Sequence, residues 1–129
     1  MKHTPYYALP VYQKSLALHD LSSAVASYFS KEKNILKLKK TASLREQIAS
    51  SLFIDSNLIA KQIEQAVTTN SYEARLQSAS FINTITRNLS SYCNGLDYDG
   101  VKEKEYVNLL RRELKSFRVS FKQWRKSLK

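Results

Sequence analysis

The sequence predicts an all-α fold, an antiparallel up-down bundle of four helices that forms a single domain over residues 1–129. Three observations predict it. Only two Gly and two Pro leave little material for the tight turns of a strand-rich fold. Hydrophobic residues make up 43% of the chain, enough for one core. They recur at helical spacing in four segments, roughly 10–29, 35–68, 71–94 and 101–128.

The first two predicted helices are separated by the polar sequence SKEKN. Pro10 is suited to the first turn of the helix over 10–29. The predicted inward positions of this helix are Leu18, Leu21, Val25 and either Tyr28 or Phe29. The helix over 35–68 has five apolar side chains near helical spacing, namely Leu44, Ile48, Leu52, Ile59 and Ile63.

The last two predicted helices are bounded by capping residues and by glycines. Asn70 or Ser71 caps the helix over 71–94, and the sequence NGLDYDG, which holds both glycines, predicts its end and a loop. The apolar face of this helix comprises Leu76, Ala79, Ile82, Leu89 and Tyr92. The helix over 101–128 has acids in its first turn and cations in its last, as the helix dipole favours. Its apolar residues are spaced by three and four and form one stripe: Val107, Leu110, Leu114, Phe117, Phe121, Trp124 and Leu128.

The net charge of +10 is concentrated in two segments. Residues 31–45 hold six cations and one acid, and residues 101–129 hold ten cations and three acids. From Lys115 to Lys129 there is no acid, whereas Glu and Lys alternate on an ordinary solvated helix. This unbalanced positive charge indicates that the helix faces an anion, either on an external ligand or on a neighbouring subunit. The candidate nucleic-acid-binding residues are Lys31, Lys33, Lys37, Lys39, Lys40, Arg45, Arg111, Arg112, Lys115, Arg118, Lys122, Arg125 and Lys126.

The position of these cations in a bundle predicts where they act. In an up-down bundle the second and fourth helices begin at the same end, so the two basic segments meet there and form the candidate binding surface. No base-reading module is recognisable, and binding is therefore expected to rest on phosphate contacts and shape. The aromatic residues Phe117, Phe121 and Trp124 are interpreted as core side chains in preference to a base-stacking platform.

Catalytic and metal-binding chemistry is not predicted. Neither His3 nor His19 belongs to a metal-ligand pattern, and no phosphate-loop, dinucleotide-binding or hydrolase motif occurs. Four acids recur every nine residues, which is two and a half helical turns, so successive members face opposite sides and form no catalytic pair. These acids are Glu46, Asp55, Glu64 and Glu73. The chain is therefore predicted to be a non-enzyme without a cofactor.

The remaining features concern location and assembly. No run of 18 apolar residues exists and MKHTPYYALP lacks the apolar stretch of a secretory signal, which predicts a cytoplasmic protein without a membrane partner. The lone Cys93 cannot form an internal disulfide and is interpreted as a packing residue. Eight Tyr exceed the needs of one small core, so Tyr6, Tyr7 and Tyr12 are candidates for a subunit contact.

The chain resembles small basic four-helix-bundle proteins that include the ribosomal-RNA intervening-sequence proteins and Avd, the accessory variability determinant of diversity-generating retroelements. The resemblance covers nearly the whole chain in length and helix order, in SYFSKEKN, in LREQIASS and in a basic final helix that contains Trp124. It implies a homopentameric ring that partners a reverse transcriptase and contacts its RNA template, or an RNA/DNA hybrid, through basic surfaces. The RNA-facing residues that it implies are Arg111, Arg112, Lys115, Arg118, Lys122, Arg125 and Lys126.

The leading hypothesis from the sequence is a non-enzymatic RNA-binding accessory protein that serves a retroelement reverse transcriptase in mutagenic retrohoming. The alternative is a structural oligomer of the intervening-sequence type whose basic face binds an acidic protein partner. A third interpretation, a basic amphipathic helix at a membrane surface, is disfavoured because the bundle needs the same apolar stripe.

Overall fold

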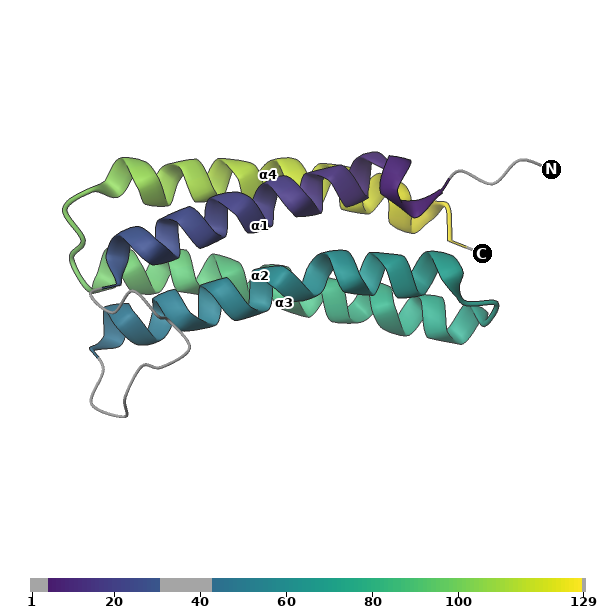
Figure 1. Ribbon diagram of the computed structural model, residues 1–129, viewed down its shortest axis with the longest axis horizontal. Coiled ribbons are helices and arrows are strands. Elements are labelled where there is room, and N and C mark those ends of the chain that lie inside the picture. Colours follow the sequence, from purple (N-terminus) through teal and green to yellow (C-terminus); the bar gives the residue numbers. More distant parts are fainter. Residues whose placement is uncertain (1–4, 31–42, 129) are drawn as a thin grey trace.

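The computed structural model describes residues 5–30 and 43–128. All regular structure in these residues is helical, and the four long helices lie side by side as a four-helix bundle (Figure 1). This confirms the predicted all-α class. The elements are the 3-10 turn η1 (Tyr6–Ala8) and the helices α1 (Pro10–Phe29), α2 (Leu44–Thr68), α3 (Tyr72–Tyr98) and α4 (Lys104–Lys126).

Each helix of the bundle packs against two neighbours. α1 lies against α2 and α4, and α3 lies against the same two helices. Residues 69–71 connect α2 to α3 at one end of the bundle, and residues 99–103 connect α3 to α4 at the opposite end (Figure 1). α4 packs more closely on α1 than on α3. The α3–α4 side is therefore the most loosely packed side of the bundle.

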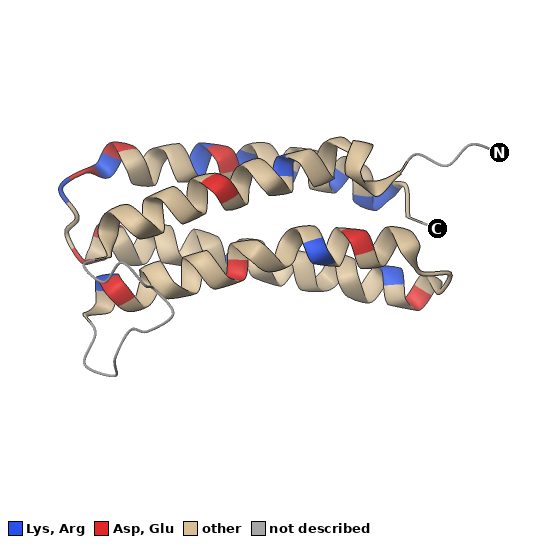
Figure 2. Ribbon diagram, viewed as in Figure 1, with Lys and Arg blue, Asp and Glu red and all other residues tan. Residues whose placement is uncertain are grey.

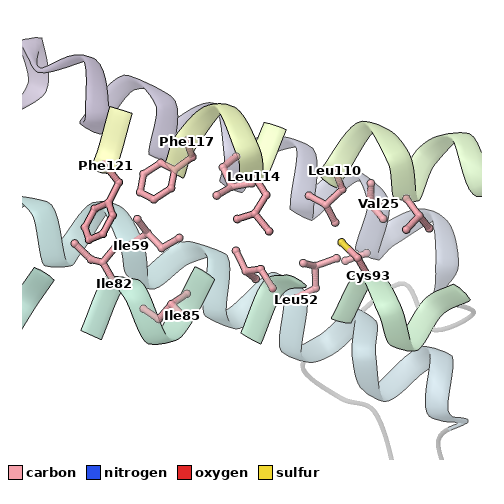
Figure 3. Close-up of a cluster of buried hydrophobic side chains, with 14 of the residues drawn as sticks. Val25, Leu52, Ile59, Ile82, Ile85, Cys93, Leu110, Leu114, Phe117 and Phe121 are labelled. Atoms are coloured by element: carbon pink, nitrogen blue, oxygen red, sulfur yellow. The ribbon is translucent and has the colours of Figure 1, made fainter. Parts of the chain in front are cut away.

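The core contains side chains from all four helices (Figure 3). Six of the seven apolar residues predicted for the last helix are buried, and the seventh, Leu128, is half-buried. The rings of Phe117 and Phe121 are stacked with centroids 6.0 Å apart, and those of Phe121 and Trp124 are 6.1 Å apart. These three aromatic residues therefore belong to the core and do not form an exposed base-stacking platform.

A few predicted core positions differ from the structure. Phe29 is buried at the end of α1, whereas Tyr28 is 53% exposed and stacks edge-on against Tyr106 of α4. Leu44 and Leu76 are exposed because they lie in the first two turns of α2 and α3, close to the ends of the bundle. The helical spacing identified the face correctly but gave no information about how far the neighbouring helices extend.

α2 begins at a capping box that the sequence analysis did not identify. The Ser43 hydroxyl accepts a hydrogen bond from the Glu46 backbone N–H at 3.2 Å, and the Glu46 carboxylate accepts one from the Ser43 N–H at 3.4 Å. Because the backbone of Ser43 is extended, the helix predicted for 35–68 does not pass through this residue. Residues 35–42 of that prediction lie outside the described part of the chain.

The third helix continues past its predicted end at residue 94 to Tyr98. Gly95 lies within it, where a Cβ would come 2.7 Å from Cδ1 of Ile48, so the missing side chain leaves room for the Ile48 side chain of α2. The second glycine, Gly100, ends the helix with φ +80° and donates its N–H to the Asp97 carbonyl at 3.0 Å. The predicted helix C-cap and following loop in NGLDYDG are thus found at Gly100, whereas Gly95 lies inside the helix, which continues past its predicted end.

The fourth helix is shorter than predicted. It begins at Lys104 and ends at Lys126, against the predicted bounds 101–128. Val101 is buried although it precedes the helix, and its N–H donates to the Leu96 carbonyl at 3.3 Å. The connection 99–103 therefore contributes a side chain to the core before α4 starts.

Candidate nucleic-acid interface

α4 separates its apolar and basic side chains onto different sides. Because the apolar stripe faces the core, the cations that alternate with it lie at the surface. Arg118 is half-buried and the other five members of the set are exposed. We call this set the α4 basic face, which consists of Arg112, Lys115, Arg118, Lys122, Arg125 and Lys126.

The α4 basic face has no salt-bridge partner in the described part of the chain. Two salt bridges are present among residues 5–30 and 43–128, and neither involves this face. α4 has no acid after Glu113, and Figure 2 shows Lys and Arg without Asp or Glu along its last turns. Six cations on a single helix, five of them exposed and Arg118 half-buried, thus have no carboxylate within 4.0 Å among the described residues.

Two other predicted binding residues are paired with acids of the same chain. Arg45 Nε lies 2.8 Å from Asp99 Oδ2, and Arg111 lies 2.6 Å from Asp97 Oδ2. Arg111 also donates to the side-chain oxygen of Asn94 at 2.9 Å. Because carboxylates already satisfy these guanidinium groups, they are weaker anion-binding candidates than the α4 basic face.

The structure also bears on where the basic surface lies. The Arg45–Asp99 pair joins the start of α2 to the connection before α4, so these two helices begin at the same end. The two paired cations lie at this end, however, and the cations without a carboxylate partner extend along α4 toward its other end (Figure 2). The remaining predicted cations, Lys31, Lys33, Lys37, Lys39 and Lys40, lie outside the described residues.

A hollow of about 190 Å³ lies between α3 and α4, and we call it the α3–α4 hollow. Its wall on α3 contains a cation that the sequence analysis did not identify, Arg87. Its lining residues are Asn83, Arg87, Arg118, Phe121, Lys122 and Arg125. A second hollow of about 310 Å³ at the end of α4 is lined by Lys122, Arg125 and Lys126. The α4 basic face therefore borders both hollows.

Arg87 was missed because its own segment is not basic. Residues 46–100 hold six acids and three cations, so a count of charge along the chain gives no signal there. The available signal is that α3 has no acid between Glu73 and Asp97. The α3 wall next to the α4 basic face is therefore free of carboxylates over most of its length.

The four regularly spaced acids do not form a site. Glu46 belongs to the capping box of α2, and Asp55 accepts a hydrogen bond from the Tyr92 hydroxyl. Burial, followed by this bond to Asp55, raises the pKa of Tyr92 to about 12. The charge of Glu64 raises the pKa of the neighbouring Tyr6 phenol, and Glu73 lies in the first turn of α3. Each acid therefore has a local structural role.

The other titratable candidates are structural as well. Cys93 is fully buried, and burial raises the pKa of its thiol to about 11. The ring of His19 forms a hydrogen bond of 2.9 Å with the buried Ser56 hydroxyl, which links α1 to α2. Over residues 5–30 and 43–128, no three His, Cys, Asp or Glu side chains are grouped as metal ligands. Nor does any helix in these ranges combine the length and the apolar run needed to cross a bilayer.

An apolar groove of about 320 Å³ lies on another side of the bundle, between α1 and α4. It contains Tyr28 and Leu109, which are 53% and 42% exposed. We call it the α1–α4 groove, and its lining residues are Leu21, Ala24, Val25, Tyr28, Tyr106 and Leu109. The apolar groove and the α3–α4 hollow thus lie on the two flanks of α4.

Comparison of the chain with protein-family models, with curated proteins and with solved structures gives no match, and the basic and apolar surfaces beside α4 are therefore interpreted from their own chemistry.

Proposed function

We propose that this chain is a non-enzymatic, cytoplasmic RNA-binding accessory protein that partners a retroelement reverse transcriptase. The observation that supports the proposal is the α4 basic face, whose six cations have no carboxylate within 4.0 Å in the described part of the chain. From Arg112 to Lys126 this face spans 14 residues, or about 21 Å along the helix. That length matches several successive phosphates of a nucleic acid.

The chemistry of the α4 basic face favours phosphate over a protein partner. Protein interfaces draw most of their affinity from buried aromatic and Arg anchors. The aromatic residues on this part of α4, Phe117, Phe121 and Trp124, are all buried in the bundle. The face therefore offers Arg but no exposed aromatic anchor, and Arg side chains suit the bidentate geometry of phosphate oxygens.

A salt titration with structured RNA tests this function. If the α4 basic face neutralises phosphates, the logarithm of the association constant should fall linearly with the logarithm of salt concentration. The expected slope is about 0.7–0.9 per phosphate contact, or roughly 4–5 for six contacts. Fluorescence anisotropy of a labelled RNA measures the affinity at each salt concentration.

Polyglutamate of matched charge serves as the competing probe in the same titration. Retention of RNA with the expected slope, and weaker retention of polyglutamate, supports the proposal. Failure to bind structured RNA at low salt, together with binding of polyglutamate, would instead identify an acidic protein as the partner and contradict RNA binding.

The proposal includes an assembly, in which helices in antiparallel up-down order form a homopentameric ring. What supports an assembly is the α1–α4 groove, because Tyr28 and Leu109 expose apolar surface that a second copy would cover. The native mass of the protein should correspond to five chains, and Leu109→Glu should lower it by placing a charge in the contact. A single-chain mass for the unaltered protein contradicts the ring.

A further inference from the structure

The α3–α4 hollow combines side chains from two helices into one concave site. Asn83 and Arg87 are four residues apart on α3 and lie on one face of that helix. On α4, Arg118, Lys122 and Arg125 follow at intervals of four and three and also share a face. The hollow therefore has cations on both walls, whereas the rest of the α4 basic face offers them from one helix.

The positive charge of the α3–α4 hollow favours binding of an anion. Its four cations have no carboxylate partner within 4.0 Å among the residues that the structure describes. Their mutual repulsion is therefore not balanced by a salt bridge. Phe121 contributes an apolar side chain that is only 3% exposed, and charges beside an apolar wall are screened less than charges in open solvent. An anion with several acceptor oxygens would relieve this repulsion.

The size of the hollow indicates how much of an anion it would enclose. At about 190 Å³ it corresponds to roughly six water molecules at about 30 Å³ each. This is below the range of about 300–1,000 Å³ that is usual for drug-sized ligands. The space accommodates one tetrahedral group with some hydration, and a whole nucleotide would extend beyond it.

We propose that the α3–α4 hollow is a site for a single phosphate group, held between Arg87 of α3 and the cations of α4. The identity of this group rests on the proposed function, and we take it to be a phosphodiester of the RNA backbone. Arg118 and Arg125 can each present two N–H donors to phosphate oxygens, and the Asn83 amide offers one more donor from the opposite wall. Arg87 fixes the position of the phosphate across the groove.

The role of Arg87 differs from that of the α4 cations. A row of cations on one helix attracts a polyanion without fixing its position along the row. A cation on a second helix defines one point at which a phosphate is contacted from two sides. Arg87 is thus a positioning residue, which sets where the RNA backbone lies on α4 in addition to contributing charge.

The first experiment uses inorganic phosphate and the full-length protein. The Nε–Hε resonances of the arginine side chains are followed by NMR as phosphate replaces chloride at constant ionic strength. Arg87, Arg118 and Arg125 should shift together and saturably, whereas Arg112, which lies on α4 outside the hollow, should not. In the Arg87→Gln variant the shifts of Arg118 and Arg125 should become smaller. Absent or non-saturating shifts at Arg87, Arg118 and Arg125, or equal shifts at Arg112, would overturn the site.

The second experiment compares RNA affinities of single variants. Arg87→Gln should weaken RNA binding about 5- to 10-fold at about 0.1 M salt and lower the salt slope by about 0.7–0.9, the effect of one lost phosphate contact. Lys61→Gln, an exposed residue of α2, makes the same charge change away from the hollow and should leave both quantities unchanged. Arg87→Lys should keep the slope and lose part of the affinity, because the bidentate geometry is lost while the charge remains.

The two experiments separate failure of the site from failure of the proposed function. Unaltered RNA binding in Arg87→Gln overturns the inferred site and leaves RNA binding by the α4 basic face intact. Saturable phosphate shifts in a protein that does not bind RNA overturn the proposed function and support the hollow as a site for a phosphate group. Thermal unfolding of each variant, followed by circular dichroism, verifies that the bundle is preserved.

Discussion

Replacing Phe117 with alanine is expected to lower the free energy of unfolding by about 3–5 kcal/mol. Phe117 is 0% exposed and stacks on Phe121, so its removal leaves a cavity between α4 and the rest of the core. The surrounding side chains belong to packed helices and relax only partly into such a cavity. Urea unfolding followed by circular dichroism gives the change directly, at one fixed protein concentration because the proposed assembly would make stability depend on concentration.

Val119→Ala provides the matched control on the same helix. Val119 is 55% exposed, so its truncation should change the free energy of unfolding by less than about 0.5 kcal/mol. Alanine is also the better helix former, which works against any loss. If Phe117→Ala were no more destabilising than Val119→Ala, the placement of the apolar stripe of α4 in the core would be wrong.

Neutralising three lysines of the α4 basic face is expected to weaken RNA binding by about 100-fold at about 0.1 M salt. The changes are Lys115→Gln, Lys122→Gln and Lys126→Gln, all at exposed positions. Each lysine removed from phosphate contact should lower the salt slope by about 0.7–0.9, so the slope should fall by about 2–3 in total. Anisotropy titrations at several salt concentrations measure both quantities.

A second triple variant distinguishes the α4 basic face from net charge. Lys61→Gln, Lys102→Gln and Lys104→Gln remove the same three charges at exposed positions outside this face. The loss of affinity should be much smaller, because contacts with phosphates and not total charge determine the salt slope. Equal losses in the two triple variants would mean that RNA, if bound, is held by the overall field of the protein.

The periodicity of the sequence was sufficient to predict the helices and most of the core. The apolar residues of α4 recur by three and four without interruption, and this pattern placed Phe117 and Trp124 correctly. Pro10 marked the first residue of α1. Periodicity did not separate the two glycines, because a glycine that ends a helix and one that leaves room for a side chain of another helix are the same residue type. The difference depends on Ile48, which lies on another helix.

The candidate site was less predictable than the fold, since it depends on pairs of residues distant in sequence. Arg111 is part of the basic stripe in the sequence, but its guanidinium group forms a salt bridge with Asp97 and a hydrogen bond with Asn94 of α3. Arg87 is the opposite case, an isolated cation in its own segment that joins a cationic hollow once α3 lies beside α4. A count of charges along the chain shows neither that a cation is paired with a distant acid nor that an isolated cation lies beside a distant basic helix.

The loose contact between α3 and α4 has a consequence for how the protein would respond to the anion proposed for the α3–α4 hollow. The two helices pack least closely along the side on which the cations of the hollow face each other. An anion that bridges them would act as an additional link between helices, and by linkage a ligand that binds only the folded chain raises its resistance to heat. The bundle would therefore be tightened by occupancy, with loaded and empty molecules differing in rigidity more than in shape.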